Sequence, residues 1–296
     1  MTDVTSAPEP AAVSWQELLD AAVGRLTDAG FENAEQEAWW LVQQAGGFEA
    51  SEVVVHLDDL ATFGTATYLR QLLDRRLAGE PLQYVLERWA FRSMEIFVDD
   101  RVLIPRPETE VLTQMALEEC RRLDAHVAVD LGTGSGVIAQ ALLVEWAGIE
   151  VWATDSSADA LAVAQINLAG LGRLATDVRL VEGSWFDALP AELAGTVDVV
   201  VTNPPYVAES EVADLPDEVR LWEPMEALVA GPTGLEDIEQ IVAEAPLWLT
   251  QPGSLLVEIA PQQAGASVRM ARSAGFGSAA IWPDFAGRDR ILLART

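Results

Sequence analysis

The chain has 296 residues, half of them hydrophobic, and a formal net charge of −29 at pH 7. All 18 basic residues are arginine, which excludes a Walker A phosphate site, a Schiff-base lysine and a kinase-type phosphate lysine. The acidity also argues against a nucleic-acid duplex as substrate, because binding to the phosphate backbone normally depends on clustered basic side chains. A local arginine patch would still be compatible with RNA.

The single cysteine, Cys120, cannot form an internal disulfide, which is typical of a reducing compartment. Neither it nor the two histidines, His56 and His126, has the spacing of a zinc site. We therefore interpret all three as structural and expect no metal. The N-terminus lacks the basic and apolar regions of a signal peptide, and no apolar run reaches the length of a membrane span. We expect a cytoplasmic protein with no membrane partner.

Residues 1–12 are polar and rich in proline and alanine, and we expect a disordered tail there. Residues 13–80 are predicted to form a small helical domain, because Ser14 and Glu17 give a capping box ahead of a helical pattern that reaches Leu26. Further helices are expected over 34–44, 51–60 and 67–77. We expect this domain to recognise the substrate, with a purely structural cap as the alternative.

Residues 81–107 have a different pattern and are predicted to form a β-hairpin linker. Strand-like runs over 91–98 and 102–104 flank Asp99 and Asp100, which suit a turn.

From residue 108 to residue 296 the pattern alternates between helix and strand, which indicates an α/β domain with a doubly wound parallel sheet. The last two strands are joined by only a short connection, so we expect a hairpin that inserts the final strand antiparallel. Strands are predicted over 126–131, 150–155, 177–182, 197–202, 254–259, 279–283 and 289–294. Helices are predicted over 108–123, 135–147, 157–169, 234–249 and 261–274.

The first strand of this domain ends in the glycine-rich loop Asp130-Leu131-Gly132-Thr133-Gly134-Ser135-Gly136, directly before a helix. Glycines let the backbone approach a ligand closely, and open α/β sheets bind ligands at this position. The dinucleotide fingerprint requires Gly-x-Gly-x-x-Gly, and Val137 breaks that spacing. Asp130 also suits an ammonium group better than a pyrophosphate.

The second strand ends at Asp155, whose carboxylate can accept hydrogen bonds from both hydroxyls of a ribose. An adenosine ligand with a cationic amino-acid tail and no phosphate is S-adenosylmethionine, which becomes S-adenosylhomocysteine after methyl transfer. A glycine loop alone could be a structural turn, but the loop, Asp130 and Asp155 together predict this donor. Trp185, after the third strand, is placed to pack its ring against the adenine, with simple core packing as an equal alternative.

A buried strand over 197–202 stops at Asn203-Pro204-Pro205-Tyr206, because two consecutive prolines cannot continue a ladder. The side-chain oxygen of Asn203 and the carbonyl of Pro204 could accept both hydrogens of a flat NH₂ group, and Tyr206 could stack on that group. These contacts would orient the nitrogen and stabilise the positive charge that grows on it during methyl transfer. The motif alone leaves an amide or an adenine open as acceptor, and a plain turn is the alternative.

The glycine loop and Asn203–Tyr206 resemble those of the protein-glutamine N5-methyltransferases. Pro81-Leu82-Gln83-Tyr84 and residues 103–110, together with the helical N-terminal region, resemble more specifically the peptide chain release factor glutamine methyltransferases. The resemblance runs from about residue 14 to the end and includes Glu223-Pro224 and residues 287–290. Glu87 and Ala260 depart from it, because glycine is frequent in the family at both positions.

The resemblance implies a Rossmann-like class I methyltransferase domain, S-adenosylmethionine as donor, and the glutamine of the Gly-Gly-Gln motif of bacterial release factors as acceptor. It implies that the donor is bound by Asp130, Gly132, Thr133, Gly134, Ser135, Gly136, Asp155, Trp185 and Asn203. It implies that the substrate is bound by Arg106, Asn203, Pro204, Pro205 and Tyr206, of which Asn203, Pro204 and Tyr206 serve catalysis.

Three other functions remain open from the sequence. A ribosomal-protein glutamine methyltransferase would carry the same Asn-Pro-Pro-Tyr motif. An adenine-N6 nucleic-acid methyltransferase would hold a similar flat NH₂ group, although the net charge disfavours it. From another class, the chain could be a catalytically silent donor-binding or adaptor protein.

Overall fold

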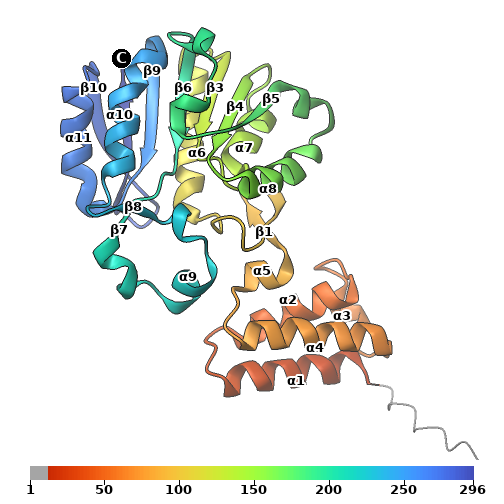
Figure 1. Ribbon diagram of the computed structural model, residues 1–296. Coiled ribbons are helices and arrows are strands. Elements are labelled where there is room, and N and C mark those ends of the chain that lie inside the picture. Colours follow the sequence, from red (N-terminus) through yellow and green to blue (C-terminus); the bar gives the residue numbers. More distant parts are fainter. Residues whose placement is uncertain (1–12) are drawn as a thin grey trace, which may run out of the picture. The chain divides into compact units, whose positions relative to one another are not determined.

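The computed structural model describes residues 13–296, and the chain divides into two compact units after Glu87 (Figure 1). The tail expected over residues 1–12 lies outside the described residues. Within residues 13–296, no helix combines the length and the apolar character needed to cross a bilayer.

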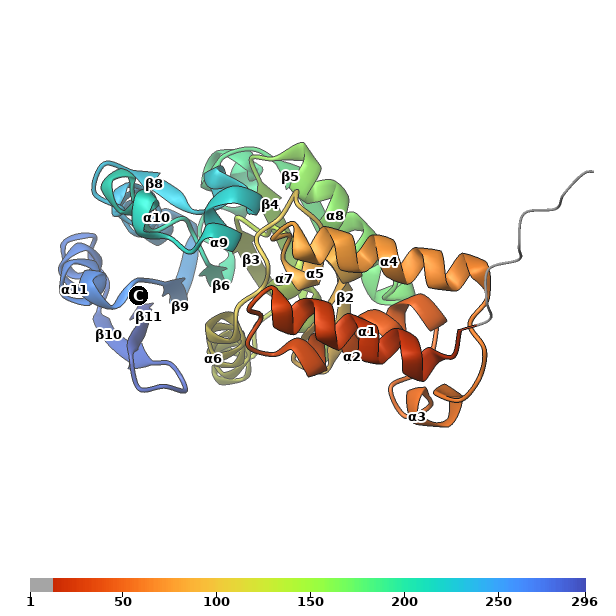
Figure 2. The same cartoon turned by 90° about the horizontal axis from the view of Figure 1, so that it is seen from below.

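The N-terminal unit, as far as the structure describes it, is helical. The Ser14 hydroxyl accepts the Glu17 N–H at 3.2 Å, and the Glu17 carboxylate accepts the Ser14 N–H at 2.9 Å, which confirms the predicted capping box. Helices α1, α2 and α4 lie side by side (Figure 2) and bury a core that includes Leu26, Leu41 and Leu72. The helices are α1 (Trp15–Asp28), α2 (Ala34–Gly46), α3 (Val53–His56), α4 (Phe63–Leu77) and α5 (Leu82–Leu86).

Two predicted helices of this unit have different bounds in the structure. α3 ends at His56 rather than continuing to residue 60, because the backbone that follows pairs with the start of α1: the Gln16 N–H donates to the Leu57 carbonyl at 2.8 Å. α4 begins at Phe63 rather than at residue 67, since the Thr62 hydroxyl accepts the Thr65 N–H at 3.1 Å and caps the helix there. α5 lies within the segment for which only a hairpin is predicted.

α5 is followed by Glu87, whose backbone is left-handed with a φ of 54°. A residue with a Cβ adopts this conformation at a cost of roughly 1–2 kcal/mol, whereas glycine adopts it freely. This explains why glycine is expected at this position. Ala260, the other departure, has an ordinary φ of −75° and carries no such strain.

The hairpin of the second unit lies earlier than predicted. β1 (Arg88–Phe91) pairs with β2 (Met94–Phe97), so the turn falls at Arg92 and Ser93 and not at Asp99 and Asp100. Arg92 has a φ of 54° and is held by tertiary contacts: its guanidinium donates to both carboxylate oxygens of Glu145, at 2.6 and 2.7 Å. Residues 102–104 form no strand.

The second unit contains a seven-stranded sheet with the strand order β10-β11-β9-β6-β3-β4-β5. Strands β9, β6, β3, β4 and β5 are parallel, and β11 is antiparallel to both β9 and β10. The predicted α/β sheet and its antiparallel last strand are therefore confirmed. The strands are β3 (Val127–Leu131), β4 (Glu150–Asp155), β5 (Val178–Glu182), β6 (Val197–Thr202), β9 (Leu249–Glu258), β10 (Ser278–Pro283) and β11 (Asp289–Arg295).

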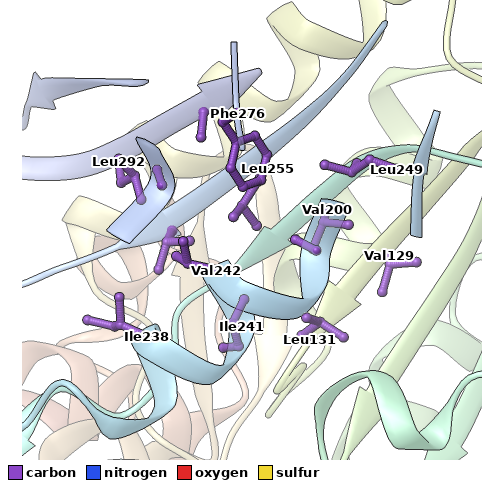
Figure 3. Close-up of a cluster of buried hydrophobic side chains, with 14 of the residues drawn as sticks. Val129, Leu131, Val200, Ile238, Ile241, Val242, Leu249, Leu255, Phe276 and Leu292 are labelled. Carbon is purple, nitrogen blue, oxygen red and sulfur yellow. The ribbon is translucent and has the colours of Figure 1, made fainter. Parts of the chain in front are cut away.

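Helices cover this sheet in two groups. α6 (Pro107–Leu123) packs on α7 (Val137–Glu145), which packs on α8 (Ala158–Ala169), while α10 (Glu236–Trp248) packs on α11 (Ala264–Ser273) (Figure 1). The apolar face of α10 meets the sheet in a fully buried cluster. Figure 3 shows Ile238, Ile241 and Val242 of this helix beside Val200 and Leu255 of the strands.

The segment between β6 and α10 contains elements that the helix–strand alternation does not predict. β7 (Val207–Ala208) pairs in parallel with β8 (Val229–Gly231), and α9 (Asp217–Trp222) lies between them in the sequence. Short 3₁₀ helices complete the unit, over Gly172–Asp177, Trp185–Ala188, Ala191–Leu193, Glu209–Asp214, Met225–Ala227 and Pro261–Gln263. This segment follows the carboxyl end of β6, where the candidate site lies.

Candidate functional site

A cavity of about 380 Å³ lies at the carboxyl ends of β3, β4 and β6. Among the residues predicted to form the site, Gly132, Thr133, Gly134, Ser135, Asp155, Trp185, Asn203 and Pro205 line it. Asp130, Gly136, Pro204, Tyr206 and Arg106 are not part of its lining. The glycine loop, Asp155 and the first residue of the Asn-Pro-Pro-Tyr segment therefore share one cavity.

The glycine loop after β3 takes its shape from left-handed backbone at Gly132, Gly134 and Gly136, with φ values of 66°, 54° and 80°. A Cβ added at Gly132 would lie 3.1 Å from the Trp185 ring, and one at Gly136 would lie 3.1 Å from the Ala164 Cβ. Neighbouring side chains therefore leave no room for a Cβ at Gly132 or Gly136, and only glycine fits there without displacing a neighbour.

Asp130 lies beneath this loop and is fully buried. One of its carboxylate oxygens, Oδ2, accepts the Thr133 hydroxyl at 2.6 Å and the Ala139 N–H at 3.2 Å, while Oδ1 has no hydrogen-bond partner among the described residues. Burial raises the pKa of this carboxyl to about 7, although both hydrogen bonds oppose the rise. Asp130 thus stabilises the loop through its hydrogen bonds with Thr133 and Ala139. Its direct contact with an ammonium group stays a prediction.

Asp155, the last residue of β4, faces the cavity from the side of the loop. Its two oxygens are oriented by backbone donors: Gly134 N–H donates to Oδ2 at 2.8 Å and Ser157 N–H donates to Oδ1 at 2.9 Å. Burial raises the pKa of this carboxyl, and the backbone hydrogen bonds limit the rise. Each oxygen keeps a further lone pair for a hydroxyl donor in the cavity.

Trp185 begins the 3₁₀ helix Trp185–Ala188 with a φ of 43°. Its ring covers Gly132 and lines the cavity, and the same side chain packs against the core cluster on the α10 side of the sheet. Both interpretations of Trp185, as a cavity wall and as a core residue, therefore describe its position. Burial raises the pKa of Asp237, and a hydrogen bond from the Trp185 side chain acts against the rise.

The Asn-Pro-Pro-Tyr segment leaves β6 at Asn203. Pro204 is buried, and Tyr206 is half-buried with a phenol pKa raised to about 12 by burial. Gln263 anchors the backbone of this segment. Its side-chain amide donates to the Tyr206 carbonyl at 2.9 Å and to the Gly234 carbonyl at 2.7 Å. These contacts fix the backbone that follows Asn203.

Two buried glutamates bind residues predicted to act in the site or their neighbours. Glu258, at the end of β9, accepts the Thr109 hydroxyl at 2.9 Å, and the same hydroxyl lies 3.3 Å from the side-chain nitrogen of Asn203. Burial raises the pKa of Glu258 to about 7. Glu223 accepts the Arg106 guanidinium at 2.5 Å. Arg106 is thus engaged in an ion pair, and its expected contact with substrate stays a prediction.

Several cavity residues have no predicted role in the sequence analysis: Arg101, Val102, Leu103, Pro105, Thr109, Glu226, Ala227, Val229, Ala230 and Asp237. The first five lie within or near the family-like stretch 103–110, which is the signal that could have found them. Glu226 to Ala230 come from the unpredicted elements between β6 and α10, and no pattern marks them. Among the described residues, no group of three or more His, Cys, Asp or Glu side chains could hold a metal ion.

Comparisons with known proteins match both units. The family described as "PrmC N-terminal domain" matches residues 17–86, and the "Methyltransferase small domain" family matches residues 107–218. A protein of Cereibacter sphaeroides named release factor glutamine methyltransferase is 38% identical, over 94% of this chain and 97% of its own length. A protein of the same name from Bifidobacterium longum is 35% identical, over 94% of this chain and 98% of its own length.

A solved structure supports the fold alone. The hMettl16 catalytic domain, in complex with MAT2A 3'UTR hairpin 6, superposes with a TM-score of 0.55 and 16% identity, over 78% of this chain and 81% of that chain.

Proposed function

This chain belongs to the family of release factor glutamine methyltransferases, and from that premise we propose its reaction. The chain transfers a methyl group from S-adenosylmethionine to the side-chain amide nitrogen of the glutamine in the Gly-Gly-Gln motif of peptide chain release factors. The reaction takes place in the cytoplasm, where release factors act, and S-adenosylhomocysteine is the second product. Residues 13–80 recognise the protein substrate, residues 81–107 link the two parts, and residues 108–296 carry the chemistry.

One observation carries this proposal: Asp155 and the glycine loop line the same cavity as Asn203 and Pro205. A cavity of about 380 Å³ is of the size that small-molecule sites have, about 300–1,000 Å³. The residues present fit S-adenosylmethionine, since Asp155 offers oriented carboxylate oxygens to a ribose and the loop offers backbone without side chains. A sulfonium donor needs no phosphate-binding lysine, and this chain has none.

When bound, the donor supplies an electrophilic methyl carbon. The residues of this chain supply the position and charge distribution of the acceptor. The Asn203 side-chain oxygen and the Pro204 carbonyl accept the two hydrogens of the glutamine NH₂ group, which points its nitrogen toward the donor. Both acceptors stabilise the positive charge that develops on this nitrogen, and one preorganised contact of this type is worth about 10²–10³ in rate. Tyr206 stacks on the planar amide.

The glutamine nitrogen needs no general base before it reacts, because the proton that it must lose becomes acidic only once the methyl group is attached. This agrees with a site in which the cavity lining contains no histidine or lysine among the described residues.

The proposal is tested by incubating the protein with labelled S-adenosylmethionine, purified release factor, ribosomal proteins and DNA, and by mapping the label with mass spectrometry. We expect label on one glutamine of the release factor. Label on ribosomal proteins or DNA alone, or no label on any protein glutamine, would contradict the proposal. A release factor with glutamine replaced by glutamate in its Gly-Gly-Gln motif serves as the matched control and should stay unlabelled.

A further inference from the structure

Three side chains from distant parts of the chain form a continuous hydrogen-bonded row that runs from the cavity lining, at Asn203 and Thr109, to the buried Glu258. Asn203 Nδ2 lies 3.3 Å from Thr109 Oγ1, which lies 2.9 Å from Glu258 Oε2. We propose that Thr109 and Glu258 are positioning residues that hold the Asn203 amide with its oxygen toward the substrate. The inference deepens the proposed function and rests on it, because it concerns how the acceptor amide is oriented.

The direction of the row follows from the number of donors and acceptors. An ionised carboxylate can only accept, so the single hydroxyl proton of Thr109 is donated to Glu258. The hydroxyl then has only lone pairs left for Asn203, and the amide must turn its NH₂ toward Thr109. Its oxygen consequently faces the other way, to the cavity that Asn203 lines. Without this constraint the two orientations of an asparagine amide are nearly equal in shape.

Burial makes the constraint strong. Thr109 and Glu258 have exposed fractions of only 3% and 1%, and Glu258 does not line the cavity, so a lost partner is poorly replaced by water there. The Thr109 hydroxyl comes from the first turn of α6 and the carboxylate comes from the end of β9, so both are held by regular elements. A wrongly turned amide would place its oxygen against a hydroxyl that has no proton to offer, which is costly in a buried site.

The charge state of Glu258 controls the direction of the row. Burial raises its pKa to about 7, the Thr109 hydrogen bond and Arg290 and Arg106 act against the rise, and Glu108 adds to it. A protonated Glu258 can donate to Thr109, which frees the Thr109 proton for the Asn203 oxygen and turns the amide. Methyl transfer should therefore weaken as the pH falls through about 7. The ionised form of Glu258 is the productive one.

Variants of Thr109 isolate this effect. Thr109→Val removes the hydroxyl but keeps the shape, and Thr109→Ser keeps the hydroxyl. We expect Thr109→Val to lower kcat for release factor roughly tenfold or more, with little change in the Kd for S-adenosylmethionine. Thr109→Ser should recover most of that loss. Thr113→Val is the matched control, because Thr113 is equally buried on α6 and donates only to the Thr109 carbonyl, at 2.8 Å.

The pH profile gives a readout that a packing defect would not change. Wild-type kcat should fall as the pH drops through about 7, whereas the Thr109→Val enzyme should lose this dependence because Glu258 no longer reaches Asn203. Thr109→Val with kcat within about twofold of wild type, or Thr113→Val with an equal loss, would overturn the inference. An unchanged pH dependence in Thr109→Val would overturn it as well.

The amide orientation can also be measured without turnover. The chain has three asparagines, Asn33, Asn167 and Asn203, so selective ¹⁵N labelling gives a side-chain NMR spectrum that is simple to assign. We expect one Asn203 amide proton to exchange slowly with water in the wild type and rapidly in Thr109→Val. Equal exchange in both proteins would refute the inference. If the wild type methylates no release-factor glutamine, the proposed function fails, and this measurement still decides how Asn203 is held.

Discussion

Asp155→Asn is the sharpest test of how the donor is held. Asp155 presents two oxygens, each fixed by one backbone N–H, and each is free to accept one ribose hydroxyl. Asparagine keeps one oxygen and turns the other acceptor into a donor. The variant therefore loses one hydrogen bond to the ribose and sets an NH₂ group against the N–H of Gly134 or Ser157. A hydrogen bond to a charged group contributes about 1.5–3 kcal/mol, which corresponds to a roughly 10- to 100-fold weaker Kd.

Isothermal titration of S-adenosylmethionine or S-adenosylhomocysteine into the two proteins measures this change directly. Turnover at saturating donor should fall much less than affinity, because Asp155 does not contact the acceptor amide. Asp159→Asn is the control, since Asp159 is an exposed residue in the first turn of α8 and changes the net charge equally. A Kd within about threefold of wild type for Asp155→Asn, or an equal effect of Asp159→Asn, would refute the assignment of Asp155 to the donor.

Three further substitutions test the scaffold around the site by urea unfolding. Gly234→Ala should destabilise the protein by about 1–3 kcal/mol, because its Cβ would lie 2.6 Å from the Tyr206 carbonyl oxygen at a φ of 75°; a change near zero would contradict this packing. Glu119→Gln should cost about 3 kcal/mol at neutral pH. Hydrogen bonds from Arg295 lower the Glu119 pKa from 4.5 to about 2 against the opposing effect of burial, so this stabilisation is complete above 4.5 and is lost as the pH falls toward 2; a difference independent of pH would refute it. Glu87→Gly should be neutral or stabilising by up to about 1 kcal/mol, since it relieves left-handed strain, and a clear loss would show that the Glu87 side chain matters more than its backbone.

The sequence predicts the regular elements of the second unit well, because each carries its own signal. Strands such as β3 and β6 are mostly apolar, end at turn-forming residues and are largely buried. The hairpin turn lies earlier than the sequence predicts, because contacts with a distant part of the chain fix its position. Arg92 holds a left-handed backbone through contacts with Glu145, which lies 53 residues away in the sequence. No local turn pattern marks that position.

The residues of the candidate site likewise include some that local sequence patterns reveal and some that only the fold brings together. The glycine loop and Asp155 can be found because each stands at the end of a recognisable strand, and open α/β sheets bring those ends together. Thr109 and Glu258 could not be given roles, because the Thr109 hydroxyl meets Asn203 across 94 residues and Glu258 across 149. Their partnership exists only in the folded chain. Local sequence signals therefore find the groups at the ends of strands better than the side chains that meet them through the fold.

The cavity is assembled from segments that lie far apart in the sequence. The loops after β3, β4 and β5 and the stretch 101–109 build one part, and residues between Asn203 and Ala230, together with Asp237, build the rest. Most of the second part is one continuous segment of the chain, between the end of β6 and the start of α10. If this segment holds the acceptor as proposed, its exchange would alter acceptor preference while the glycine loop after β3 stays unchanged. The same boundary offers a place to join chimeric enzymes, at Thr202 and Leu235.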